Sequence, residues 1–243
     1  MNLRSLSHST IACALALLCV GCKDAPGRPE APATRPDQVL SFAALYKDNC
    51  AACHGENGKN GAAISLANPV YLAVAGVQNI QQITAKGVPG TLMPAFAKSQ
   101  GGMLTDQQIA VLAQGLEAEW GSANALGGQA APAYASTSAG DPAQGQKAYS
   151  TFCASCHGAD GTGVIRGKLH TGSLVDPAYL ALISDQGLRS LIIAGQPQDD
   201  MPDWRSDITG AGSRAMTDQE ITDTVAWLVS HRIATPGQPY TRP

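Results

Sequence analysis

Apolar residues recur at helical spacing in four stretches of the chain. The first lies at 39–46, and the second follows Asp141-Pro142, a pair typical of a helix start. The other two follow Thr105 and Thr217, each with Gln or Glu three residues later, as in a capping box. The apolar positions are Val39, Phe42, Leu45 and Tyr46; Tyr149 and Phe152; Ile109, Leu112, Leu116 and Trp120; and Ile221, Val225, Leu228 and Val229. Strand patterns are weak, so the sequence predicts an all-α protein.

The second half of the chain repeats the first. Residues 50–55 (CAACHG) match 153–158 (CASCHG) at an offset of 103. The matches continue at an offset of 108 and then of 112, always in the same order. They pair Asn68-Pro69 with Asp176-Pro177, Gly87-Val88-Pro89 with Gly195-Gln196-Pro197, Met93-Pro94 with Met201-Pro202, and Thr105-Asp106-Gln107 with Thr217-Asp218-Gln219. One module is therefore used twice. We also expect one further short helix in each module, beginning at Pro69 and at Pro177.

The N-terminus has the pattern of an export signal. Arg4 precedes the uninterrupted apolar run 11–20, which is too short to span a bilayer. The following Cys19-Val20-Gly21-Cys22 resembles the lipobox of bacterial lipoproteins, although Cys19 stands where that family usually has Leu. The resemblance implies cleavage before Cys22 and lipidation of that residue. Ordinary cleavage that releases a soluble periplasmic protein is the alternative.

Composition divides the remainder of the chain. Residues 22–37 are rich in proline and are expected to form an extended tether, and 123–139 are rich in small residues and are expected to form a flexible linker. The predicted boundaries are 1–21 for the signal peptide, 22–37 for the tether, 38–122 for the first domain, 123–139 for the linker, 140–235 for the second domain and 236–243 for a tail.

Charge and composition exclude some classes of function. The formal net charge is −3 and the isoelectric point is about 5.9, so the basic excess of a nucleic-acid-binding protein is missing. Hydrophobic residues make up 44% of the chain, enough for folded cores, but aromatic residues make up only 5%. A large apolar group other than an aromatic side chain would explain how such small domains fill their cores.

Both modules carry Cys-x-x-Cys-His, the signature of covalent c-type haem attachment. Two thiols three residues apart on one helical turn reach the two vinyl groups of a haem, and the next histidine points to the iron. The sequence predicts two haem c groups, held by Cys50 and Cys53 with His54, and by Cys153 and Cys156 with His157. Three alternatives are weaker. A thioredoxin-like dithiol would require a βαβ pattern, which is not visible, and a zinc site would have to join two CxxC pairs that lie in separate modules. Plain disulfides would leave the two histidines unexplained.

Methionines at equivalent places are candidates for the second axial ligand. Met93 and Met201 follow their histidines by 39 and 44 residues, and each precedes a proline. A thioether is a soft ligand that favours Fe(II). Met103 and Met216 are rivals that nearly align, and a purely packing role is the alternative for any of the four. His170 and His231 have no counterpart in the first module and are expected to be surface or structural residues.

On these motifs each module resembles a class I c-type cytochrome domain, especially those of the third subunit of cbb3 oxidases. The resemblance covers about 38–122 and 140–233. It implies an all-α fold of two tandem domains around covalent haem, with Met93 and Met201 as distal ligands. The small residue common on the first helix of that family is Gly145 here, whereas its counterpart in the first module is Phe42. The sequence also departs in its expected lipid anchor, because related subunits usually have a transmembrane helix.

These features predict a relay of single electrons between respiratory or photosynthetic partners at the periplasmic face of a bacterial membrane. The expected partners are redox proteins: a quinol-oxidising complex, a terminal oxidase, a dehydrogenase or a small cytochrome or cupredoxin. The chain would act as a shuttle or as the cytochrome subunit of a larger complex. The alternative is a dihaem redox enzyme, peroxidase-like or sulfur-oxidising, which requires one open haem.

Acidic residues around one methionine give a finer hypothesis. Asp199, Asp200 and Asp203 lie close in sequence to Met201. Negative charge near iron stabilises Fe(III), so the second haem is expected to have the lower reduction potential. The alternative is an acidic loop whose charge is screened by solvent.

Overall fold

The computed structural model describes residues 34–167, 169–205 and 214–233. The predicted signal peptide, Cys22, most of the tether and the tail 236–243 lie outside the described residues. The short 3-10 helix η1 (Pro36–Gln38) belongs to one unit, and residues 39–243 form a second unit that holds all other elements. No helix among the described residues is sufficiently long and apolar to cross a bilayer.

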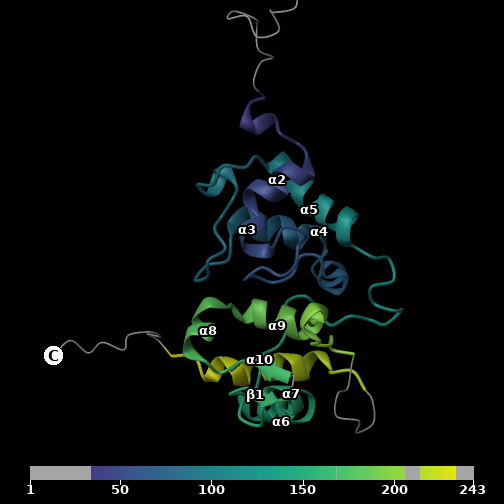
Figure 1. The fold of residues 1–243 in the computed structure, drawn as a ribbon, viewed down its shortest axis with the longest axis vertical. Coiled ribbons are helices and arrows are strands. Elements are labelled where there is room, and N and C mark those ends of the chain that lie inside the picture. Colours follow the sequence, from purple (N-terminus) through teal and green to yellow (C-terminus); the bar gives the residue numbers. More distant parts are fainter. Residues whose placement is uncertain (1–33, 168, 206–213, 234–243) are drawn as a thin grey trace, which may run out of the picture. The chain divides into compact units, whose positions relative to one another are not determined.

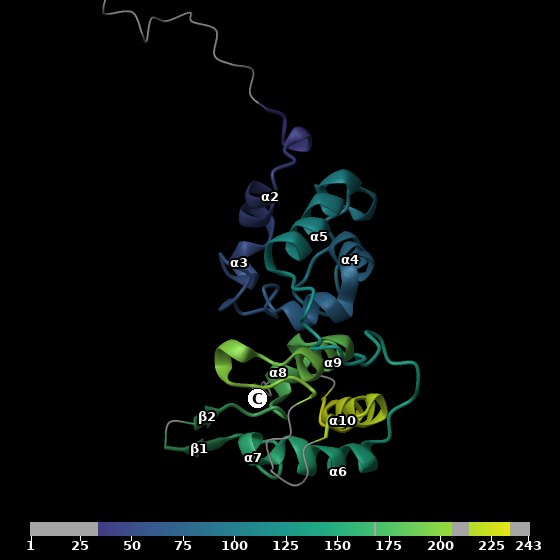
Figure 2. The ribbon, with the colours of Figure 1, turned by 90° about the vertical axis from the view of Figure 1, so that its right-hand side faces the viewer.

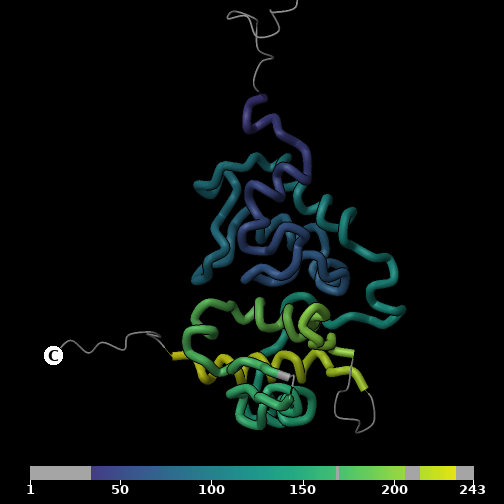
Figure 3. The backbone as a smooth tube through the Cα atoms, viewed as in Figure 1, coloured from purple at the N-terminus to yellow at the C-terminus, as the bar shows by residue number. Residues whose placement is uncertain are grey.

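The second unit contains two helical domains that follow one another along the chain (Figure 1). The elements of domain one are α2 (Phe42–Asn49), α3 (Ala51–His54), α4 (Pro69–Lys86), η2 (Lys98–Gln100) and α5 (Asp106–Trp120). Those of domain two are α6 (Pro142–Phe152), α7 (Ala154–His157), β1 (Val164–Arg166), β2 (Leu169–Thr171), α8 (Pro177–Leu182), α9 (Asp185–Ala194), η3 (Pro197–Asp199) and α10 (Asp218–Ser230). The all-α prediction is confirmed, with one small hairpin added. The tube in Figure 3 runs first through domain one, from purple to teal, and then through domain two, from green to yellow.

Both predicted capping boxes form at the start of the last helix of each domain. The Thr105 hydroxyl accepts from the Gln108 backbone N–H at 3.2 Å, and Thr217 accepts from Glu220 at the same distance. The side chains of Gln108 and Glu220 accept in return from the cap N–H groups. Both helices therefore begin where the sequence predicts.

The middle helix of domain one, α4, is kinked at the point where domain two has two separate helices, α8 and α9. Gly76 has non-helical dihedrals (φ 68°, ψ 157°) inside α4, a backbone conformation that favours glycine. The equivalent residue of domain two, 108 positions later, is Ser184, which caps the start of α9 after α8 has ended. The same bend is therefore made once by a glycine and once by a new N-cap.

The first and last helices of the two domains cross through opposite arrangements of large and small residues. A Cβ on Gly145 of α6 would lie 1.9 Å from the Asp223 carbonyl oxygen of α10, with Trp227 beside it. In domain one the glycine is on the other helix, since a Cβ on Gly115 of α5 would lie 2.2 Å from the Phe42 ring. Gly115 and Trp227 occupy equivalent positions. The large Phe42, which stands where domain two has Gly145, is therefore accommodated by a small residue on the opposite helix, Gly115. Figure 2 shows α6 alongside α10.

Strand structure in the described part of the chain consists of the hairpin β1–β2 and two isolated bridges. The strands are antiparallel, with Val164 opposite Thr171 and Ile165 opposite His170. The hairpin lies in the segment after the CxxCH motif, which is five residues longer in domain two than in domain one, as the change of offset from 103 to 108 shows. It projects from the end of α7 in Figure 2.

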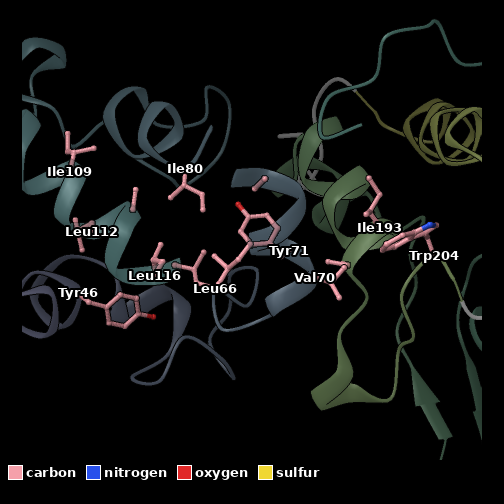
Figure 4. Close-up of a cluster of buried hydrophobic side chains, with 14 of the residues drawn as sticks. Tyr46, Leu66, Val70, Tyr71, Ile80, Ile109, Leu112, Leu116, Ile193 and Trp204 are labelled. Atoms are coloured by element: carbon pink, nitrogen blue, oxygen red, sulfur yellow. The ribbon is translucent and has the colours of Figure 1, made fainter. Parts of the chain in front are cut away.

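Domain one and domain two share one hydrophobic cluster. Buried residues of α4, including Val70 and Tyr71, pack in the same cluster as Ile193 and Trp204 (Figure 4). The Asn68 side-chain amide donates to the carbonyls of Ala194 and Gly195 at 3.0 and 3.1 Å. Its oxygen caps α4 by accepting from Val70 N at 2.9 Å. The two domains are therefore in direct contact through α4 and the end of α9.

The segment expected to be a flexible linker is held in place along its second half. The buried guanidinium of Arg189 donates to the carbonyls of Ala133 and Tyr134, to the Thr222 hydroxyl at 2.9 Å and to the Asp218 carboxylate. Tyr134 packs against the shared cluster, and its hydroxyl is hydrogen-bonded to Tyr71. Composition predicts a flexible linker over 123–139, and within it these long-range bonds connect residues 133–134 to domain two.

Candidate haem sites

The first CxxCH motif forms one tight helical turn at the end of α2. Cys50 ends α2 by donating its N–H to Tyr46 O at 2.8 Å, and the His54 N–H returns to Cys50 O at 3.0 Å. Gly55 then closes α3 with φ 84°, where a Cβ would lie 1.9 Å from a backbone oxygen. The Tyr46 hydroxyl donates to Gly55 O at 2.7 Å. Two cysteines and a histidine are thus fixed within the five successive residues 50–54.

The second motif has the same geometry. Cys153 N donates to Tyr149 O at 2.8 Å, and His157 N donates to Cys153 O at 3.0 Å. Gly158 has φ 82°, and the Tyr149 hydroxyl donates to Gly158 O at 2.7 Å. Each contact has a counterpart 103 residues earlier. The repeat read from the sequence is therefore also a repeat of backbone and hydrogen bonds.

The four cysteines carry free thiols. Burial raises the pKa of Cys50 to about 11 and that of Cys153 to about 12, so both thiols are protonated at neutral pH. Burial lowers the pKa of His54 and of His157. Both imidazoles are therefore neutral, which is the protonation state in which a ring nitrogen can ligate a metal.

The His54 ring is oriented by a backbone carbonyl. Its Nδ1 lies 2.7 Å from the Ile64 carbonyl oxygen, and because that oxygen can only accept, Nδ1 carries the proton. The lone pair of the neutral ring is then on Nε2. This is the arrangement in which a second-shell bond fixes the tautomer of a metal-ligating histidine.

The His157 ring has no such support. Its Nδ1 is buried, and among the described residues it has no hydrogen-bond partner. The two histidines that the sequence treats as equivalent therefore differ at the ring nitrogen that faces the protein.

The two Met–Pro loops fold back on the ends of α4 and α9 in the same way. Gly87 ends α4 with φ 68°, and a Cβ there would lie 2.7 Å from Met93 O. Gly195 ends α9 with φ 64°, and a Cβ there would lie 2.6 Å from Met201 O. The glycines matched in the two halves of the sequence are therefore needed for the close approach of the methionine backbone.

Exposure separates the candidate methionines from their rivals. Met93 and Met201 are both half-buried. Met103 is 82% exposed, and Met216 is buried in the hydrophobic cluster at 7% exposure. Met216 N donates to Trp204 O at 2.9 Å, as Leu104 N does to Phe96 O at 2.8 Å, so Met216 is the counterpart of a core leucine. Met93 and Met201 are the two methionines with matching surroundings.

The remaining histidines lie elsewhere. His170 is exposed on β2. His231 Nδ1 is 2.9 Å from Trp227 O, and its ring meets the Trp227 ring edge-on at 4.9 Å. These contacts match the surface and structural roles expected for the two residues.

The acidic residues near Met201 are not equivalent. Asp203 pairs with Arg205, whose Nε lies 3.0 Å from Oδ1, and the Arg205 guanidinium stacks 4.8 Å above the Trp204 ring. Asp199 and Asp200 are exposed. Arg205 compensates one of the three charges, and solvent screens the other two, which weakens the electrostatic basis of the predicted lower potential.

The residues present fit a covalently attached haem. Each domain offers two free thiols and a neutral imidazole on one turn, together with a thioether on a loop braced by glycine. Among the described residues no group of three or more His, Cys, Asp or Glu side chains is arranged to hold a metal ion directly. Two thiols, an imidazole and a thioether are a donor set that suits haem iron: the cysteines would attach the porphyrin, and His and Met would ligate the iron.

Several supporting groups were not found by reading the sequence. The Ile64 carbonyl is a backbone group, and its residue type carries no signal. The two tyrosine hydroxyls, by contrast, have a detectable signal, because Tyr46 and Tyr149 both lie four residues before the first cysteine of their motif. Matching the repeat outward from CxxCH would have found them.

Comparison with known proteins supports the repeat. A family model described as cytochrome C oxidase, cbb3-type, subunit III matches residues 37–114, and a model described as cytochrome c matches 142–232. The "Cbb3-type cytochrome c oxidase subunit CcoP" of Azospirillum sp. (strain B510) is 31% identical over 143 residues. That alignment covers 52% of this chain and 43% of the relative, so the chain matches less than half of that protein's length.

A solved structure gives a weaker match. A chain of the Kuenenia stuttgartiensis reducing HAO-like protein complex superposes with a TM-score of 0.42 at 18% identity, covering 79% of this chain and 96% of that one. The family matches fall on the two halves that carry the duplicated CxxCH turn. The chain therefore carries two cytochrome c domains in tandem, each matched by its own family model.

Proposed function

We propose that the chain relays single electrons through two covalently bound haem c groups, one in each domain. Cys50 and Cys53 hold the first haem with His54 and Met93 as axial ligands. Cys153 and Cys156 hold the second with His157 and Met201. The observation that carries the proposal is the duplicated turn, in which each hydrogen bond around one CxxCH recurs around the other.

Haem iron supplies a one-electron Fe(II)/Fe(III) couple, and the chain's residues determine how it is held. The thioether bonds prevent loss of the cofactor. The neutral imidazoles would need no deprotonation to bind the iron, and the methionine thioethers would compete with exogenous ligands for it. The domain contact at Asn68 and the anchoring of the linker at Arg189 hold the two sites in one unit.

The proposed setting is the periplasmic face of a bacterial membrane, with Cys22 as the lipid attachment point. The expected partners are redox proteins. Because the matched relative is a cbb3-type oxidase subunit by name, we favour docking to a terminal oxidase or a similar membrane complex over free shuttling. Replacement of Cys22 by Ser should release the protein from the membrane fraction, whereas replacement of Cys19 by Ser should not.

An optical and stoichiometric measurement tests the central proposal. The pyridine haemochrome of the purified chain should give two haems per polypeptide, and the ferric protein should show the weak far-red band of methionine-bound iron at twice the intensity of a monohaem cytochrome. Neither carbon monoxide nor peroxide should change the spectrum. One haem that binds these ligands would contradict the relay and favour a dihaem enzyme with an open site.

A further inference from the structure

One carbonyl distinguishes the surroundings of the two proposed haem ligands. Ile64 O accepts from His54 Nδ1 at 2.7 Å, whereas His157 Nδ1 is buried without a partner in the described part of the chain. The CxxCH turns themselves are the same in both domains. The difference therefore originates in the segment that follows each turn.

The segment that follows explains the difference. In domain one Ala63 N donates to Cys53 O at 2.9 Å, which places the next carbonyl, that of Ile64, against the histidine. The residue equivalent to Ala63, 108 positions later, is Thr171.

In domain two Thr171 is paired with Val164 in the hairpin. The Thr171 hydroxyl donates to the Cys156 carbonyl oxygen at 2.5 Å and accepts from Val164 N at 3.1 Å. A side-chain hydroxyl thus stands where domain one has a direct backbone bond. Because it extends beyond the backbone, it keeps the strand further from the turn. The carbonyl of Gly172, the counterpart of Ile64, consequently makes no bond to His157.

We propose that the β1–β2 hairpin, acting through Thr171, withholds a carbonyl from His157 and thereby raises the reduction potential of the second haem. A hydrogen bond from the outer ring nitrogen increases the basicity of a metal-bound imidazole. A more basic ligand stabilises Fe(III), so a histidine without this bond favours Fe(II). The inference rests on the proposed function, in which both histidines bind haem iron, and makes Thr171 a positioning residue.

This effect opposes the one expected from charge. Acidic residues near Met201 would lower the potential, an effect that is weakened because Arg205 compensates Asp203 and solvent screens Asp199 and Asp200. A comparison of the two haems as they stand would mix both effects. A test must therefore change the histidine's hydrogen bond within one domain while its acidic loop stays constant.

A loop exchange in the full-length, haem-loaded chain does this. Residues 158–173 are replaced by the sequence of residues 55–65 carrying E56Q. Both loops then have a formal charge of +1, so the exchange does not alter the local charge. The reciprocal chain has 158–173, carrying K168Q, in place of 55–65, and both loops are then neutral. The variant I165T changes a side chain on the hairpin that is 78% exposed and serves as the control.

The first readout is a potentiometric titration of both haems. We expect the exchange in domain two to lower the equilibrium constant for reduction of its haem about tenfold, which is about 59 mV for one electron. The reciprocal exchange should raise that of the first haem, and I165T should change neither. Unchanged potentials in both exchanged chains would overturn the inference.

The second readout is hydrogen exchange at histidine Nδ1, followed by NMR of the reduced, ¹⁵N-histidine-labelled chain. The Nδ1–H of His54 should exchange slowly and that of His157 faster, and the loop exchange should slow the latter. Equal protection in the parent chain would contradict the proposal. If the far-red methionine band is missing but both haems are attached, only the methionine assignment fails and the histidine comparison stands. A chain without haem at His157 overturns both proposals.

Discussion

Domain one and domain two build the same haem-binding turn with different support. In domain one the supporting groups are mainly backbone: the Ile64 carbonyl holds His54, and a bent helix leads to the methionine loop. Domain two adds a hairpin and a buried guanidinium, and its His157 Nδ1 has no hydrogen-bond partner among the residues that the structure describes. The duplicated turn is thus the constant part of the module. The segments after it differ, and they give each domain its own properties.

The largest expected effect comes from removing the thiols of one domain. The double variant C153A/C156A should lose the covalent haem of domain two and keep that of domain one, so the haem content falls from two to one per chain. C50A/C53A should do the reverse. Mass spectrometry of the denatured chain checks the outcome. Loss of both haems in either variant would mean that the domains do not mature independently.

Arg189 provides the next largest effect. The equivalent residue in domain one is the half-buried Gln81. Arg189→Met leaves the Asp218 carboxylate and the linker carbonyls without their buried donor and should destabilise the protein by about 3 kcal/mol.

Chemical denaturation measures that loss, and limited proteolysis of the linker should become faster. Gln81→Met is the matched control and should change neither measurement. Equal effects of the two variants would show that Arg189 contributes nothing specific to anchoring the linker.

The crossing of the first and last helices gives a third comparison. Gly145→Ala places a Cβ 1.9 Å from the Asp223 carbonyl, a backbone atom that can move only with its helix. We expect a cost of about 1–3 kcal/mol. Gly115→Ala meets the Phe42 ring at 2.2 Å, which is a side chain that can rotate, and should cost less. Calorimetry of the two variants decides the order, and a larger loss in Gly115→Ala would contradict the rigid-partner argument.

The smallest effect concerns pH and the two capping boxes. The Arg214 guanidinium and the Thr217 cap lower the pKa of Glu220 from 4.5 to about 2, whereas the equivalent Gln108 does not titrate. The unfolded chain protonates this carboxylate near pH 4.5, so its stabilisation is present above that pH. It is lost as the pH falls toward 2.

Because Glu220 is partly exposed, solvent screening limits the contribution to about 1 kcal/mol or less. Denaturation at a series of pH values should show this loss in the parent chain. E220Q should remove that part of the pH dependence. Parallel curves for parent and E220Q would contradict the assignment.

The capping boxes were predicted correctly because they need particular side chains at fixed spacing, which a linear sequence shows. CxxCH and the Met–Pro pairs are visible in the sequence for the same reason, and their roles as haem ligands stay predictions. The Ile64 carbonyl could not be predicted, because every residue has a carbonyl and only the fold selects one. The pairing of Phe42 with Gly115, in place of Gly145 with Trp227, could be predicted only in part. The sequence shows that Phe42 replaces a small residue, but the role of Gly115 becomes clear only when the crossing helices are known. The hydrogen bonds to the linker could not be predicted for a related reason, since their donor Arg189 lies more than 50 residues away in the sequence.

The amide of Asn68 has a consequence for how two such modules can combine. Asn68 both caps α4 and donates to Ala194 and Gly195 of the other domain. Its counterpart Asp176 caps α8 equally well through its carboxylate, accepting from Ala178 and Tyr179, but a carboxylate has no N–H to donate. A second copy of domain two in the place of domain one would therefore set a negative charge against the same carbonyl oxygens. One nitrogen atom thus disfavours a pair of two domain-two copies, and it makes the domain that contributes this residue distinct from its partner at the contact.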